Sequence, residues 1–121
     1  MPRVTREQLE ALRRMQSCTI ANVIEPFDIR PRDEGFMSPE VRSMFPEMDG
    51  MIGYAVTAVI EAGRPPTPNM NVPRSDWFDE VLKVPEPRVV VMHDLDYPNP
   101  VGSFWGEVQT NVHKALGCVG T

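Results

Sequence analysis

Residues 101–121, VGSFWGEVQTNVHKALGCVGT, carry the clearest structural pattern in the chain. After a glycine turn at Gly102, apolar side chains recur at the spacing of one helix face: Phe104, Val108, Val112, Ala115 and Leu116. This spacing predicts an amphipathic helix. Lys114 lies where the last turn is expected, near the negative end of the helix dipole, and Gly117 occupies a position that often needs a left-handed residue. We therefore expect the helix to end at Gly117.

Strand patterns flank this helix and an earlier one. Residues 118–121 predict the opening of a strand, and residues 88–92 a buried strand. Residues 51–60 predict a strand covered on both faces, in which Gly53 indicates a bulge or a close backbone approach. Ser75 and Asp76 are expected to cap a helix whose apolar side chains lie against the sheet: Trp77, Phe78, Val81 and Leu82. The segment from Arg88 onward is thus a βαβ unit of an α/β fold, and because it stops early in its second strand we expect Thr121 not to end the ancestral domain.

The first half of the chain predicts two short helices and a loop. Residues 5–8, TREQ, have the form of a capping box, which predicts a surface helix over about residues 6–15. A second helix should begin at Ser17 or Cys18 and end early at Pro26. Residues 28–49 contain three prolines and are expected to be a loop, with at most one helical turn at Ser38-Pro39.

Composition limits the classes of function. The chain has 121 residues, which favours a single domain spanning residues 1–121, and its net charge is −5. Its 17 acidic residues outnumber 12 scattered basic ones, so nucleic acid is not an expected partner. No apolar run reaches the roughly 18 residues that a membrane span needs, and no signal pattern opens the chain, so a soluble cytoplasmic protein is expected. Cys18 and Cys118 are interpreted as reduced, largely buried thiols.

Two groups of residues are candidates for chemistry. His93, Asp94 and Asp96 follow a predicted strand and are residue types that bind divalent metals, but neighbours on a strand point to opposite faces, so solvated turn residues are the favoured interpretation. Asp94 alone is a better candidate for a supporting role beside the helix turn. The second group is Trp105-Gly106-Glu107-Val108, where free amides at a helix start form an anion pocket that Gly106 leaves accessible. Glu107 is either a dipole-complementing residue or a catalytic, water-positioning one, and His113 is interpreted as a helix-surface residue.

Several segments together carry a family resemblance: LRRM at 12–15, TIANVIE at 19–25, GYAVT at 53–57, VVV at 89–91, GEV at 106–108 and KALGCVG at 114–120. In order and spacing they resemble the regulator of ribonuclease E activity A family. This family includes the class II 4-hydroxy-4-methyl-2-oxoglutarate aldolases. The resemblance runs along nearly the whole chain and is most specific in the last segment.

The resemblance implies a swivelling β/β/α sandwich, incomplete in this chain, that assembles as a homotrimer or a hexamer. It implies a lyase that cleaves 4-hydroxy-2-oxo diacids to pyruvate or decarboxylates oxaloacetate with a divalent metal, usually magnesium. Trp105, Gly106, Glu107 and Val108 would bind the small 2-oxo acid substrate, with Glu107 catalytic. The family's Arg-Asp pair, which binds substrate and metal, has no counterpart in this sequence, so we expect the chain to be the N-terminal part of a longer family domain. The alternative is a non-catalytic, protein-binding regulator of an RNA-degrading ribonuclease.

Overall fold

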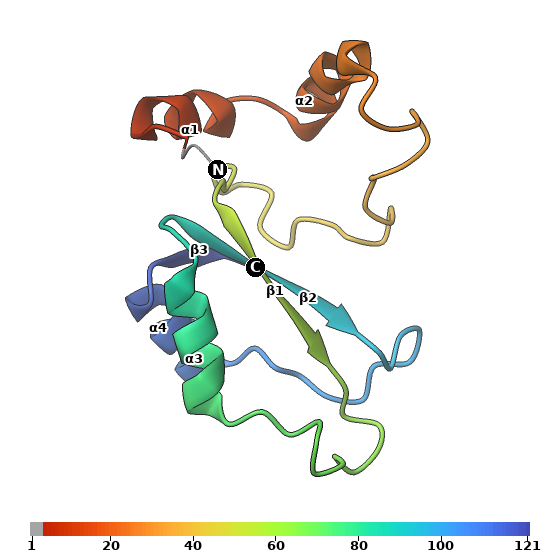
Figure 1. Ribbon diagram of the computed structural model, residues 1–121, viewed down its shortest axis with the longest axis vertical. Helices are drawn as coiled ribbons and strands as arrows, with labels where there is room; N and C mark the ends of the chain where they lie inside the picture. Colours follow the sequence, from red (N-terminus) through yellow and green to blue (C-terminus); the bar gives the residue numbers. More distant parts are fainter. Residues whose placement is uncertain (1–3) are drawn as a thin grey trace. The chain divides into compact units, whose positions relative to one another are not determined.

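The computed structural model describes residues 4–121, which belong to two compact units, Met1–Gly50 and Met51–Thr121. The first unit contains helices α1, Arg6–Arg13, and α2, Ser17–Ile24, followed by the 3-10 turn η1, Glu25–Phe27 (Figure 1). Thr5 and Gln8 form the predicted capping box: the Gln8 amide donates to Thr5 Oγ1 at 3.2 Å, and the Thr5 amide donates to Gln8 Oε1 at 2.8 Å. Pro26 lies in η1, just beyond the end of α2, as predicted.

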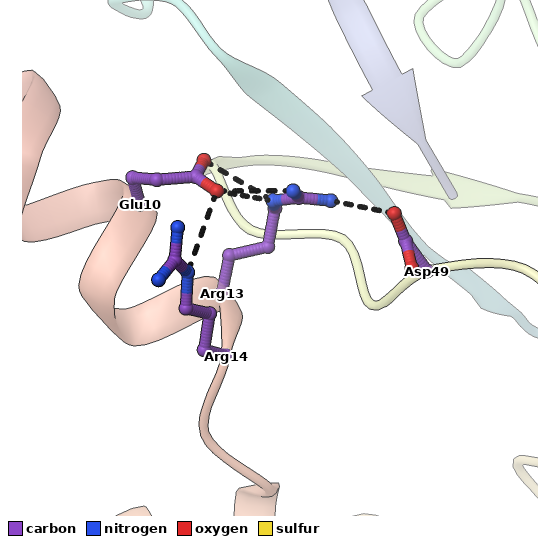
Figure 2. A network of polar contacts seen from close by, with 4 residues as sticks. All are labelled: Glu10, Arg13, Arg14 and Asp49. Atoms are coloured by element: carbon purple, nitrogen blue, oxygen red, sulfur yellow. Dashed lines mark hydrogen bonds and ion pairs between the residues drawn. The ribbon is translucent and has the colours of Figure 1, made fainter.

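An exposed ion-pair network joins α1 to the end of the first unit (Figure 2). Arg13 binds the Glu10 carboxylate with Nη2 at 3.0 Å and reaches Asp49 Oδ2 with Nη1 at 3.3 Å. Arg14 approaches the same Glu10 oxygen at 3.9 Å. The hydrogen bond from Arg13 lowers the pKa of Glu10 and raises that of Arg13. Because the Asp49 side chain is 89% exposed, solvent screening leaves the network little stabilising effect.

The remainder of the first unit has no helix or strand between residues 28 and 50. The Ser38-Pro39 segment forms a single turn closed by the Val41 amide on the Ser38 carbonyl at 2.9 Å. No residue of α1, α2 or η1 is buried, and large apolar side chains such as Phe27, Phe36 and Phe45 are exposed. The described part of this unit therefore lacks a buried core of its own.

The second unit is a three-stranded parallel sheet with two helices. Its elements, in chain order, are β1 Tyr54–Ile60, α3 Arg74–Lys83, β2 Arg88–Asp94, α4 Glu107–Ala115 and β3 Cys118–Gly120 (Figure 1). β2 pairs in parallel with β1, Tyr54 opposite Arg88, and with β3 on its other side. The prediction of an α/β fold with a βαβ unit ending in a strand at Cys118 is confirmed. No helix among residues 4–121 has the length and apolar character of a membrane span.

Within the second unit, helices cover only one face of this sheet. The two right-handed crossovers expected for parallel strands advance in the same direction along the order β1-β2-β3, which places α3 and α4 on the same face. The buried side chains Val56, Val81 and Val90 form the core on that side. On the opposite face Val59, Val91 and Val119 are 62%, 48% and 52% exposed. Within the second unit the helices lie on one face only, and coverage of the first strand on both faces stays a prediction.

Two glycines confirm the conformations expected of them. Gly117 has φ +76° and ends the helix in the left-handed region. At Gly53 an added Cβ would lie 2.6 Å from the Pro87 carbonyl oxygen, which is the predicted close backbone approach. The strand itself begins one residue later, at Tyr54, whose amide donates to that carbonyl at 2.8 Å.

Arg88, at the start of β2, is buried and joins the ends of both helices. Its Nε donates to the Val84 carbonyl at 2.6 Å, and its Nη1 donates to the Leu116 carbonyl and to Glu86 Oε1. Val84 and Leu116 are the C-terminal cap residues of α3 and α4. A buried cation thus satisfies carbonyls that helices leave unpaired at their negative ends.

Candidate functional site

The predicted binding segment, Trp105 to Val108, spans the start of α4. The helix begins at Glu107, within the segment where the sequence predicted its start, and Gly106 is its N-cap residue in an extended conformation. No side chain caps this end of the helix. The first hydrogen bond of the helix runs from the Thr110 amide to the Gly106 carbonyl at 2.9 Å. The amides before Thr110 therefore have no acceptor within the helix and point out of its N-terminal end. Such an end attracts anions through its free amides and its positive dipole.

The space around Gly106 is open. A Cβ added there would meet no atom within 4 Å, and its φ of −157° is available to any residue. Glu107 is exposed, and no side chain among the described residues binds its carboxylate. Val108 is 70% exposed. The backbone at this position therefore does not require glycine, but the open space allows a small anion to approach the first-turn amides.

Trp105 is held by a cluster of rings around His113. The His113 side chain is 2% exposed and lies 4.9–6.0 Å, between ring centroids, from four aromatic residues: Trp77, Phe78, Phe104 and Trp105. The Trp77 indole N–H donates to His113 Nε2 at 2.9 Å, and His113 Nδ1 lies 2.7 Å from the Gln109 carbonyl. Since an indole only donates and a carbonyl only accepts, the ring is the neutral tautomer with its proton on Nδ1. The interpretation of His113 as a helix-surface residue is wrong.

The sequence pattern predicted a buried face of α4 that differs in part from the observed one. The expected stripe included Val108 and Ala115, but both are exposed. The face turned inward consists of Gln109, Val112, His113 and Leu116. These positions also follow the i, i+3, i+4 and i+7 spacing of a helix face, and that spacing is the signal that could have identified them. Two polar residues on it concealed the pattern.

His93, Asp94 and Asp96 do not converge. His93 is exposed on the sheet face that points away from α3 and α4, whereas Asp94 lies on the alternate face, as strand geometry predicts. Asp96 Oδ2 accepts hydrogen bonds from the Ala62 amide at 2.7 Å and the Gly63 amide at 2.9 Å. Asp94 Oδ1 accepts from the Asp96 amide at 2.9 Å. These carboxylates hold the turn after β1 to the turn after β2, a role that the sequence did not reveal.

These residues do not make a site for a divalent metal. Among residues 4–121 no group of three or more His, Cys, Asp or Glu side chains is arranged to hold an ion. Asp96 Oδ2 already accepts hydrogen bonds from two backbone amides. The magnesium implied by the family resemblance therefore has no ligands assigned to it among the described residues, and its binding stays a prediction.

Both cysteines are free thiols, but they differ in exposure. Cys18 is exposed, which corrects the interpretation of two largely buried thiols, and its Sγ lies 3.6 Å from Gln16 Oε1. Cys118, in β3, is half-buried, and burial raises the pKa of its thiol, an effect that the nearby Arg88 charge partly opposes. Cys118 is therefore the less reactive thiol.

Comparison of the chain with protein-family models, curated proteins and solved structures finds no match.

Proposed function

We propose that this chain supplies the carboxylate-binding wall of a lyase that acts on small 2-oxo acids. The observation that carries the proposal is the start of α4, where no side chain caps the helix and the space beside Gly106 is open. A pyruvyl carboxylate placed there would accept hydrogen bonds from the amides of the first turn, at the positive end of the helix dipole. The family resemblance supplies the substrate class: 4-hydroxy-2-oxo diacids that release pyruvate, and oxaloacetate that loses carbon dioxide.

The roles of the side chains follow from their positions. Trp105, fixed by its packing on His113 with 4.9 Å between ring centroids, would form one side of the substrate site. Glu107, exposed beside the amides, would move a proton to or from the substrate or a water molecule during carbon–carbon bond cleavage. A divalent ion, when bound, would stabilise negative charge on the pyruvyl oxygens. No residue described here is assigned to that ion.

The proposal includes the finer features that the resemblance implies. They are the swivelling β/β/α sandwich, assembly as a homotrimer or hexamer, and a cytoplasmic location. The parallel α/β sheet of the second unit is compatible with that sandwich and supports it only at the level of fold class.

The test is release of pyruvate by the full-length protein that contains this chain. Oxaloacetate and 4-hydroxy-4-methyl-2-oxoglutarate are supplied with magnesium, and pyruvate is followed through lactate dehydrogenase. We expect Glu107→Gln to lower kcat by roughly 100-fold with little change in KM, as for loss of a general acid or base. We expect Gly106→Ala to raise KM about tenfold without loss of stability, because the new methyl group enters only the open space.

Thr110→Ala is the matched control, since it changes an exposed residue of α4 one turn further along. It should leave both constants unchanged. If neither acid yields pyruvate while circular dichroism shows a folded protein, the proposed function is wrong.

A further inference from the structure

A second feature of the same unit is a cavity of about 890 Å³. It is partly open to solvent, lies beside β1 and α3, and is bordered by the segments that follow β1 and β2. Its apolar wall includes Val56, Val84 and Met92, and Trp77, Phe78 and Phe104 add aromatic surface. Ligand sites in proteins typically span roughly 300–1,000 Å³ and combine such a wall with few polar groups. None of the residues from Trp105 to Val108 lines this cavity, so it is separate from the proposed carboxylate site.

One polar group in the wall lacks a partner. Gln109 lines the cavity, and its Oε1 atom is buried without a hydrogen bond among the described residues. A buried acceptor left in this state costs roughly 1–3 kcal/mol. Rotation of the Gln109 side chain would turn this oxygen toward the cavity, where a hydroxyl group on a ligand would donate to it and remove that cost. The Gln109 side chain therefore favours a ligand with a hydrogen-bond donor.

One cation in the wall is also unpaired. Arg74 is the first residue of α3, is exposed, and its side chain has no ion pair or hydrogen bond within residues 4–121. Arg64, by contrast, lines the same cavity but binds Glu61 at 2.7 Å. Arg74 stands at the positive end of the α3 dipole, so charge and dipole act together on an anion placed there.

From these three features we propose that the cavity binds an aromatic carboxylic acid that carries a hydroxyl group. The carboxylate binds Arg74, the hydroxyl donates to Gln109 Oε1, and the ring packs among Trp77, Phe78 and Phe104. A small 2-oxo diacid lacks a ring and would fill only part of this volume. Binding here is therefore independent of turnover at the start of α4.

The probe is 4-hydroxyphenylacetate, titrated into the full chain by isothermal calorimetry. Two analogues of this probe each lack one of its functional groups: phenylacetate lacks the hydroxyl group, and 4-hydroxyphenylethanol lacks the carboxylate. We expect saturable one-to-one binding of 4-hydroxyphenylacetate and weaker binding of both analogues. Arg74→Gln should weaken 4-hydroxyphenylacetate at least tenfold, as for loss of a charged hydrogen bond, and leave 4-hydroxyphenylethanol unaffected. Gln109→Leu should weaken 4-hydroxyphenylacetate about fivefold and leave phenylacetate unaffected.

Arg6→Gln is the matched control, because Arg6 is likewise the first residue of a helix and its loss changes the net charge equally. It should not alter binding. Arg74→Gln removes a cation from the positive end of a helix, so it should not lower the melting temperature, and weaker binding cannot then be attributed to unfolding. The proposal is refuted if 4-hydroxyphenylacetate does not bind at millimolar concentration. It is equally refuted if Arg6→Gln weakens binding as much as Arg74→Gln, or if neither cavity variant alters affinity.

Discussion

Replacing His113 by alanine tests the aromatic cluster that supports the start of α4. Loss of a buried Phe or Trp ring costs roughly 3–5 kcal/mol, and the smaller imidazole should cost about 2–3 kcal/mol. The half-buried Trp77 N–H also loses its acceptor, which adds about 1 kcal/mol. The free energy of unfolding should therefore fall by about 3–4 kcal/mol, and the melting temperature by roughly 10 °C or more for a unit of this length.

The assay is thermal and urea unfolding followed by circular dichroism, with two comparison variants. His93→Ala is the matched control: His93 is the other histidine of the chain, its side chain is exposed, and its loss should change stability by less than about 0.5 kcal/mol. His113→Phe keeps a ring but loses both hydrogen bonds, so it should cost about 1–2 kcal/mol.

The order of stability should be wild type, then His113→Phe, then His113→Ala. Equal losses for His113→Ala and His93→Ala would refute the reasoning, because they would mean that His113 is not in a packed interior. A larger loss for His113→Phe than for His113→Ala would contradict the claim that the ring's packing exceeds its hydrogen bonds in effect.

Three further outcomes are expected. Ellman's reagent at pH 8 should label exposed Cys18 several-fold faster than Cys118, and urea should equalise the two rates. Because folding raises the pKa of Cys118, its contribution to stability is complete below the unfolded thiol pKa, about 8.5, and is lost as pH rises through the folded pKa. Cys118→Ala should therefore reduce the loss of stability in alkaline urea titrations. Asp96→Ala should cost about 1–2 kcal/mol and speed proteolysis within residues 61–73, whereas exposed Asp79→Ala should do neither.

Features set by neighbouring residues could be predicted from the sequence. The capping box of Thr5 and Gln8 depends on side chains three positions apart. The left-handed Gly117 depends on the absence of a Cβ. The βαβ unit follows from apolar runs separated by a helix pattern. Each is determined within a few residues of chain, which is why the α/β class was predicted correctly.

Features set by distant partners could not be predicted in the same way. His113 is buried because Trp77, on another helix, donates to it, and neither residue type alone indicates that pairing. Asp96 is occupied because two amides more than thirty residues earlier in the chain lie beside it. The number of covered sheet faces is a further example, since a strand rich in β-branched residues looks the same whether one face or both are covered. The geometry of the candidate site at Gly106 agrees with what helix starts generally provide, while its ligand stays a prediction.

The buried guanidinium of Arg88 has a consequence for how the second unit opens. Its hydrogen bonds to the Val84 and Leu116 carbonyls connect the last turns of α3 and α4 to one side chain. Fraying of either helix end therefore leaves the buried guanidinium without one of its hydrogen-bond acceptors. The two ends should then open as a single cooperative event. In native-state hydrogen exchange, amides in the last turns of both helices should share one opening free energy, and they should respond together to denaturant.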